Sequence, residues 1–496
     1  MKKYVLIWTS ILFVEFFGFG CSEVNTEILP PGDETGNIVI TSQAIIPDFV
    51  GIGPQWGGYD NIQAWTGDTT LSDNGWNTLY ARLRYMQPPI MRIMVSPGWN
   101  YTPTNFNKGA GLLFKMLDFC QNNGIDVIFG EWGHQGGTGI DTTWLNTAVN
   151  FYEYLIKNKN YACIKYYNLV NEPNGNWSSI NGNYDLWKEL IRAFNARLVA
   201  RNLASASQII GPDIAIWDTH SVGWVANTKN DLGEMVTSYD IHTYPTATSV
   251  RDGSYSNLIK AYRDAAPASA VMLMAELGFK YDANSQLGME NAQLINADPY
   301  ASTDSNMMIY KAFYGIDMAD AVIQNMRMGY AGVILWDLDD AMYNNESLYK
   351  LKRWGFWNIL GEEVFGNPAD VNIRPWFYTT SLLSKYFPKG TEIMSVNLPD
   401  KKGIRAVAGK KNGKYTIAIV NSNIVSYDDV YLKMENGTEL QNMKEFTYIA
   451  GDNANFTGKL DDSGFAAPEN DHVTLDLRNP VKMAIPAQSF TLYTNM

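Results

Sequence analysis

Residues 166–211 read YYNLVNEPNGNWSSINGNYDLWKELIRAFNARLVARNLASASQIIG, and this stretch decides the fold class. It opens with the short apolar run Tyr166–Val170 and closes with a second run, Gln208–Gly211, and each run predicts a strand. Between them, apolar residues recur every three or four positions, which is typical of an amphipathic helix: Leu186, Trp187, Leu190, Ile191, Phe194 and Leu198. A strand, a helix and a strand in succession predict a parallel sheet covered by helices.

The same alternation recurs on both sides of this stretch, over residues 46–385. The predicted strands are Phe49–Gly53, Met91–Ser96, Asp126–Gly130, Tyr166–Val170, Gln208–Gly211, Tyr239–His242, Val271–Ala275 and Gly332–Trp336. Eight such units fit an α/β fold of the (β/α)8 TIM barrel type. The competing fold, an open doubly wound sheet, needs a glycine-rich phosphate turn after an early strand. The stretch Gly51–Pro54 suits that turn poorly, because proline lacks the backbone donor.

The pattern changes after Ser384. Residues 386–496 carry short runs of alternating polarity, such as 415–420 and 489–493, separated by clusters of Asn, Gly and Asp. This texture predicts a C-terminal β-sandwich domain. The segment Asn37–Ile46 is a candidate for one further strand of that sandwich.

The N-terminal residues 1–21 have the pattern of a secretory signal peptide. Lys2 and Lys3 precede an apolar run that ends at Gly20, directly before Cys21. This end resembles a bacterial lipoprotein signal, which implies lipidation of Cys21 and anchoring to the outer membrane, at the periplasmic face or the cell surface. Glu15 within the run departs from that pattern, as does Gly18, so secretion without a lipid remains the alternative. Residues 22–45 are expected to form a tether and the candidate sandwich strand.

Composition excludes several classes of partner. The formal net charge of −13 disfavours nucleic acid and anionic membrane surfaces as partners, so contact with a membrane is expected only through the lipid anchor. Three cysteines and four histidines show no metal-ligand spacing, and no metal or cofactor is predicted. Aromatic residues make up 13% of the chain, which suits contact with the apolar faces of sugars as well as core packing.

Two glutamates follow predicted strands in a way that suggests catalysis. Glu172 comes after Asn171 and before Pro173, where the strand must stop, and Glu276 follows Val271–Ala275 directly. Catalytic groups of such barrels lie at the C-terminal ends of the strands. Retaining cleavage of a glycosidic bond needs two carboxyl groups about 5–5.5 Å apart, one as acid/base and one as nucleophile.

These residues resemble the motifs of clan A, the large (β/α)8 clan of retaining glycoside hydrolases. The Asn171-Glu172 pair is similar to its acid/base motif on strand 4, and Glu276 to its nucleophile on strand 7. The resemblance implies that Asn171 binds the sugar 2-hydroxyl. It implies further substrate-site roles for residues that end strands 2, 6 and 8: Arg92 and Tyr244, which support the nucleophile, His242, and Trp336 under the cleaved sugar. No cofactor is implied, and a trailing sandwich occurs in several families of the clan.

Other strand-end residues are weaker candidates. Trp132 and His134 are interpreted as contacting substrate, with the neighbouring Glu131 in a supporting role or as a rival carboxylate. Trp56, like Trp99, is a candidate sugar platform. The acidic run Asp337, Asp339 and Asp340 is interpreted as a solvated rim rather than a calcium loop.

The predicted function is a retaining β-glycoside hydrolase that acts on a poly- or oligosaccharide. As proton donor, Glu172 is expected to have a raised pKa, and Glu276 is expected to be kept ionised by hydrogen bonds and Arg92. The main alternative is a non-catalytic carbohydrate-binding lipoprotein on a degenerate barrel. Metal-assisted hydrolysis on the same fold is disfavoured by the scarcity of histidine.

Overall fold

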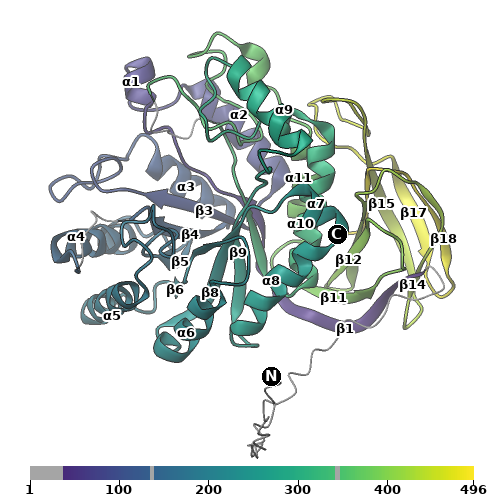
Figure 1. Cartoon of the computed structure of the whole chain (residues 1–496), viewed down its shortest axis with the longest axis horizontal. Helices are drawn as coiled ribbons and strands as arrows, with labels where there is room; N and C mark the ends of the chain where they lie inside the picture. The colour runs from purple at the N-terminus through teal and green to yellow at the C-terminus, as the bar shows by residue number, and fades with distance from the viewer. Residues whose placement is uncertain (1–36, 134–138, 341–346) are drawn as a thin grey trace, which may run out of the picture. The chain divides into compact units, whose positions relative to one another are not determined.

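The computed structural model describes residues 37–133, 139–340 and 347–496, and its larger sheet-and-helix unit is the predicted barrel (Figure 1). Parallel strands follow in the order β2-β10-β9-β8-β6-β5-β4-β3, with β7 paired to β8. An isolated parallel bridge between Gln55 and Arg92 links the two end strands. The strand bounds are β2 Gly51–Pro54, β3 Ile90–Val95, β4 Asp126–Glu131, β5 Ile164–Asn168, β6 Gln208–Ile210, β7 Ile214–Ile216, β8 Val236–Thr243, β9 Val271–Leu277 and β10 Gly332–Leu335. The (β/α)8 prediction is therefore confirmed.

Helices alternate with these strands along the chain. Their bounds are α1 Ile62–Thr66, α2 Asp73–Met86, α3 Leu113–Asn123, α4 Thr142–Glu153, α5 Tyr184–Ala200, α6 Val222–Leu232, α7 Ala247–Asp252, α8 Ser254–Ala265, α9 Gln286–Ala297, α10 Ala312–Arg327 and α11 Trp376–Tyr386. In α5 the buried residues are the six apolar positions whose spacing predicts the helix. The side chain of Asn183 caps its N-terminus by accepting a hydrogen bond from the backbone N–H of Leu186 at 3.0 Å.

The second sheet forms the sandwich domain. Its order is β16-β15-β19-β13-β12-β11-β1-β14-β18, with β17 paired to β15. The bounds are β1 Asn37–Phe49, β11 Thr391–Asn397, β12 Ile404–Lys411, β13 Lys414–Asn421, β14 Tyr427–Met434, β15 Glu439–Ala450, β16 Phe456–Thr457, β17 Asn470–Asp476, β18 Val481–Ile485 and β19 Ser489–Thr494. The segment Asn37–Ile46 lies within β1, which runs antiparallel to β11 and parallel to β14.

Helix α10 lies between the barrel and the sandwich, and nearly all of its residues are buried. Its last residue, Arg327, donates to the carbonyl oxygens of Val396 at 2.8 Å and Ala406 at 3.0 Å. Asp320, also on α10, pairs with the sandwich residue Arg405 at 2.8 Å. Hydrogen bonds and an ion pair therefore join α10, a helix of the barrel, to the sandwich.

Among the residues that the structure describes, no helix combines the length and the apolar character needed to cross a bilayer. The predicted signal peptide, Cys21 and most of the tether fall within residues 1–36, outside the described residues.

Candidate active site

The two predicted catalytic carboxylates meet at the C-terminal ends of the barrel strands. Glu276 lies within β9, and Glu172 lies in the turn that follows β5. An oxygen of each carboxylate and one ring nitrogen of His242 all lie within 4.8 Å of one another. The Glu172 backbone has a left-handed φ of 45°, a conformation that costs a non-glycine residue free energy and recurs at functional sites.

Arg92 joins both sides of this site from β3. Its guanidinium forms an ion pair with Glu276 and donates to the side-chain oxygen of Asn171 at 2.8 Å. It also donates to Gln55 at 2.7 Å and pairs with Asp213 at 3.1 Å. Because this planar group is fully buried, it fixes the positions of Glu276 and Asn171 together.

Glu276 receives a second hydrogen bond, from the hydroxyl of Tyr244 at 2.6 Å. The residue is almost fully buried. Arg92 and Tyr244 therefore hold the carboxylate from two directions.

His242 lies between the carboxylates. Its Nδ1 is 3.1 Å from an oxygen of Glu172, and its Nε2 is 2.8 Å from Asp213. Burial lowers the pKa of this imidazole, but the charges of Asp213 and Glu276 outweigh burial and raise the pKa to about 10. Glu172, His242 and Glu276 have the spacing of a metal site. A metal ion there would have to displace the proton of this imidazole and compete with the contacts that His242 makes to Glu172 and Asp213.

The pKa of Glu172 differs from the sequence-based expectation. Burial is the largest single influence and raises this pKa. The hydrogen bond and charge of His242, together with a hydrogen bond from Trp177, outweigh burial and hold the pKa below its ordinary value. These contacts therefore favour an ionised Glu172, because both of its oxygens face donors.

Asp213 is a site residue that the sequence reasoning missed. It lies between β6 and β7, and it contacts both Arg92 and His242. Burial raises the pKa of Asp213, but His242 and Arg92 outweigh it and lower the pKa to about 2. Its backbone N–H donates to Asp240 at 2.7 Å, and burial with the charge of Asp213 raises the pKa of Asp240 well above the ordinary range. Asp213 follows an apolar run by two residues, so the strand-end rule applied to that run would have found it.

Aromatic rings pack beside the carboxylates. Trp336, which is 6% exposed, lies edge-on to Trp132 with ring centroids 6.2 Å apart. Tyr244 lies edge-on to Trp354 at 5.6 Å. These four rings form one cluster, in which only Trp354 was not a sequence candidate.

A second aromatic pair is exposed on the acid/base side. Trp177 and Trp217 are each 54% exposed and meet edge to face, with ring centroids 5.6 Å apart. The indole N–H of Trp177 donates to Glu172 at 2.6 Å. Neither residue ends a predicted strand, so the sequence offered no signal for them.

Several sequence candidates lie elsewhere. Trp56 is fully buried against Trp76 and Phe119, so its ring is not available to a sugar, contrary to the prediction. Trp99 is 53% exposed, as a platform requires. His134 lies outside the described residues.

Glu131 is not placed as a rival catalytic carboxylate. It lies fully buried and accepts hydrogen bonds from the hydroxyls of Tyr101 at 2.8 Å and Tyr167 at 3.3 Å. Tyr167 packs against Tyr152 of α4 and Phe194 of α5, which places this group between the barrel and its helices.

The acidic run is not a solvated rim. Asp337, Asp339 and Asp340 are all buried, and Asp340 pairs with Arg353 at 3.2 Å and also with Arg374. The arginines that neutralise it follow later in the chain, so the like charges in the sequence suggested exposure wrongly.

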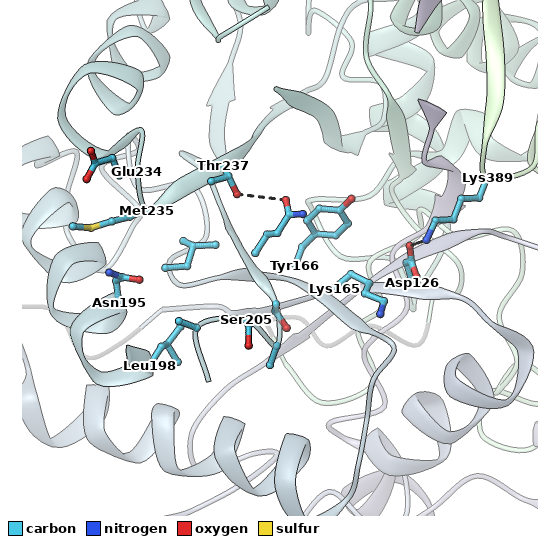
Figure 2. A pocket seen from close by; sticks show the side chains of 15 residues that line it. Asp126, Lys165, Tyr166, Asn195, Leu198, Ser205, Glu234, Met235, Thr237 and Lys389 are labelled. Atoms are coloured by element: carbon cyan, nitrogen blue, oxygen red, sulfur yellow. Dashed lines mark hydrogen bonds and ion pairs between the residues drawn. The ribbon is translucent and has the colours of Figure 1, made fainter. Parts of the chain in front are cut away.

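The pocket in Figure 2 lies at the other end of the strands. It has a volume of about 510 Å³, and its lining includes Asp126 and Gln208, the first residues of β4 and β6. Lys389 forms an ion pair with Asp126 at its edge, and Thr237 contacts Gln208 at 3.5 Å (Figure 2). This end of a barrel serves stability rather than chemistry, so the pocket is separate from the carboxylate site.

No protein-family model matches the chain, and no curated protein sequence matches it. Several solved structures do match the chain. A family 30 subfamily 8 xylanase from Clostridium acetobutylicum shares 14% identity over 92% of this chain and 99% of its own, with a TM-score of 0.60. An α-L-arabinofuranosidase from Thermotoga maritima is 13% identical over 92% of this chain and 99% of its own, with a TM-score of 0.60. An endo-β1,6-glucanase is 14% identical over 94% of each chain, with a TM-score of 0.57. The chain therefore has the fold of clan A glycoside hydrolases, a (β/α)8 barrel with a β-sandwich.

Proposed function

We propose that this protein is a retaining β-glycoside hydrolase acting on a poly- or oligosaccharide, with Glu172 as acid/base and Glu276 as nucleophile. The observation that carries the proposal is the approach of the two carboxylates, with an oxygen of each within 4.8 Å of the other. Retaining enzymes need about 5–5.5 Å between carboxyl groups, whereas inverting enzymes leave about 6.5–9.5 Å for a water. The fold shared with known glycoside hydrolases adds support.

In the proposed mechanism, Glu276 attacks the anomeric carbon while Glu172 gives a proton to the departing glycosidic oxygen. The products of this step are a glycosyl-enzyme ester and the free leaving group. Glu172, now ionised, then takes a proton from a water that displaces Glu276. Arg92 and Tyr244 hold Glu276 ready for attack, and buried charges stabilise the oxocarbenium-like transition state.

The direct test is hydrolysis of a panel of nitrophenyl glycosides, including β-xyloside, β-glucoside and α-L-arabinofuranoside. NMR should show that the first-formed product keeps the anomeric configuration of the substrate. An inverted first product would refute the double-displacement mechanism.

Variants separate the two roles. Glu172→Ala should slow a demanding substrate by about 10²–10⁴-fold, yet still form the glycosyl-enzyme with a good leaving group and regain turnover with azide. Glu276→Ala should form no covalent intermediate with any leaving group. Glu131→Ala is the matched control. If it reproduced the leaving-group dependence of Glu172→Ala, the assignment of the acid/base would be wrong.

The alternative of a carbohydrate-binding protein on a degenerate barrel is not favoured. A binding protein has no need for a buried Glu276 and a partly buried Glu172 that are held by Arg92, Tyr244 and His242. Tight binding of glycans without turnover of any panel member would support it instead.

For location, we propose a secreted protein anchored to the outer membrane through a lipid on Cys21. The proposal rests on the basic start, the apolar run and the cysteine of residues 1–21. Mass spectrometry of the mature protein should find acylated Cys21 as the first residue. An unmodified N-terminus at another position would refute the anchor.

A further inference from the structure

The acid/base candidate has a hydrogen-bond donor on each of its two oxygens. His242 faces one oxygen of Glu172 at 3.1 Å, and the indole N–H of Trp177 faces the other at 2.6 Å. Both donors favour the ionised form. A proton donor, however, must carry its hydrogen on one of these oxygens. The protonated oxygen is a weaker acceptor, so opening one of the two contacts favours acid catalysis.

The two donors differ in how easily they can move. His242 is fully buried in the barrel wall and held from its other nitrogen by Asp213 at 2.8 Å. Trp177 lies outside any strand or helix, in the segment between β5 and α5, and more than half of its surface is exposed. Its main ring neighbour is the equally exposed Trp217. Trp177 is therefore the donor that a ligand can displace.

We propose that Trp177 is a positioning residue whose indole N–H binds Glu172 until the leaving group of the substrate displaces it. This inference rests on the proposed function and adds to it the control of the acid/base. The displacing group is a sugar or aryl ring, whose flat face contacts the Trp177–Trp217 pair. The freed oxygen of Glu172 then takes a proton from solvent. As the glycosidic bond breaks, that proton passes to the departing oxygen, and Glu276 forms the new bond to the anomeric carbon.

The charged and titratable groups that face Glu172 stay the same when Trp177 is changed. They are His242 on β8, Glu276 on β9, Asp213 between β6 and β7, and the hydroxyl of Tyr244. Replacing the indole by a ring without an N–H therefore isolates one hydrogen bond.

The test compares Trp177→Phe, which keeps a ring and loses the N–H, with Trp217→Phe, its matched control. In protein labelled with ¹³C at the glutamate side-chain carboxyl, NMR follows the ionisation of Glu172 without any substrate, and the signal missing in Glu172→Gln identifies it. In Trp177→Phe the midpoint should move to higher pH by roughly half a unit or more, because a hydrogen bond to the carboxylate is lost. In Trp217→Phe it should stay at the wild-type position.

Kinetics test the displacement itself. The basic limb of kcat/KM reports the free enzyme and should move to higher pH in Trp177→Phe, whereas the basic limb of kcat reports the complex and should not move. If both limbs moved together, the indole would still contact Glu172 in the complex, and the inference would be overturned. An unchanged NMR midpoint in Trp177→Phe would overturn it too.

A failure of the proposed function looks different. In that case no substrate of the panel would be hydrolysed, while the NMR midpoints of the two variants would still separate as expected.

Discussion

At the scale of single residues, the site is a balance of buried charges. Two cations, Arg92 and the imidazolium of His242, lie among Glu172, Asp213 and Glu276. As Glu172 gives its proton to the leaving group, the carboxylates come to outnumber the cations, and the site then favours positive charge. An oxocarbenium-like transition state develops positive charge at the sugar, and such a site stabilises it before any group has to reorganise.

The hydrogen bond from Tyr244 to Glu276 allows a test of how these contacts support catalysis. Tyr244→Phe removes the 2.6 Å hydrogen bond to Glu276 and nothing else from that contact. Because hydrogen bonds to charged groups contribute about 1.5–3 kcal/mol, kcat/KM should fall by roughly 10- to 150-fold. Steady-state kinetics on the best panel substrate measure the change. Tyr349→Phe, at an exposed tyrosine, is the control, and equal activities of the two variants would contradict a role for the hydroxyl.

Glu131 gives a prediction about pH and stability. Burial raises its pKa to about 8, although hydrogen bonds from Tyr101 and Tyr167 oppose the shift. A carboxyl whose folded pKa is raised contributes its full stability below its unfolded pKa, near 4.5, and loses that contribution as the pH rises through about 8. Between these values the wild type should lose free energy of unfolding relative to Glu131→Gln.

Urea denaturation across this pH range measures the difference. Glu392→Gln, at an exposed glutamate in β11, is the matched control. Parallel stability curves for wild type and Glu131→Gln would contradict the buried, protonated state.

At the scale of elements, the cap at the N-terminus of α4 contributes to the stability of that helix. Asp141 accepts hydrogen bonds from the backbone N–H groups of Thr143 at 3.0 Å and Trp144 at 2.9 Å, at the N-terminus of α4. Asp141→Ala should therefore lower the free energy of unfolding by about 1 kcal/mol. Thermal or urea unfolding measures it against Asp68→Ala, a substitution at an exposed loop position. Equal stability of the two variants would show that solvent replaces the cap.

Elements were also what the sequence predicted best. Each of the eight predicted barrel strands is present with bounds shifted by only a few residues, because buried parallel strands are continuous apolar runs. Once the strands are placed, the residues at their ends are placed as well, such as Glu276 and Tyr244, which contact each other.

The site residues that the sequence did not predict lie in loops rather than at the ends of the predicted strands. Trp177, Trp217 and Trp354 reach the site through loops, whose paths no periodicity predicts. Trp56 follows β2 as a platform would, yet it points into the core. Asp340 is buried only because Arg353 and Arg374 return to it from later in the chain. Partners that lie this far apart in the chain cannot be recognised from local sequence patterns.

At the scale of the whole molecule, Arg405 ties the sandwich to the barrel. It pairs with the buried Asp320 and donates to the backbone oxygen of Arg251 at 3.2 Å. Arg405→Met would leave a buried carboxylate without its partner, so the free energy of unfolding should fall by about 3–5 kcal/mol. Lys157→Met, which removes an ion pair that is largely exposed, should change it little. Similar losses in both variants would contradict the role of Arg405 in joining the two layers.

Strand β1 has a consequence for the order of events during synthesis. It belongs to the sandwich but precedes the entire barrel, and Val39 finds its partner Asn397 only after every barrel strand has been made. An emerging chain thus exposes an unpaired strand edge throughout barrel synthesis, the kind of edge that invites aggregation. Pairing at such long sequence separation is also slow. β1 can therefore pair with β11 and β14 only after the barrel strands have been made, and until then residues 37–49 lack the sheet that buries their apolar side chains.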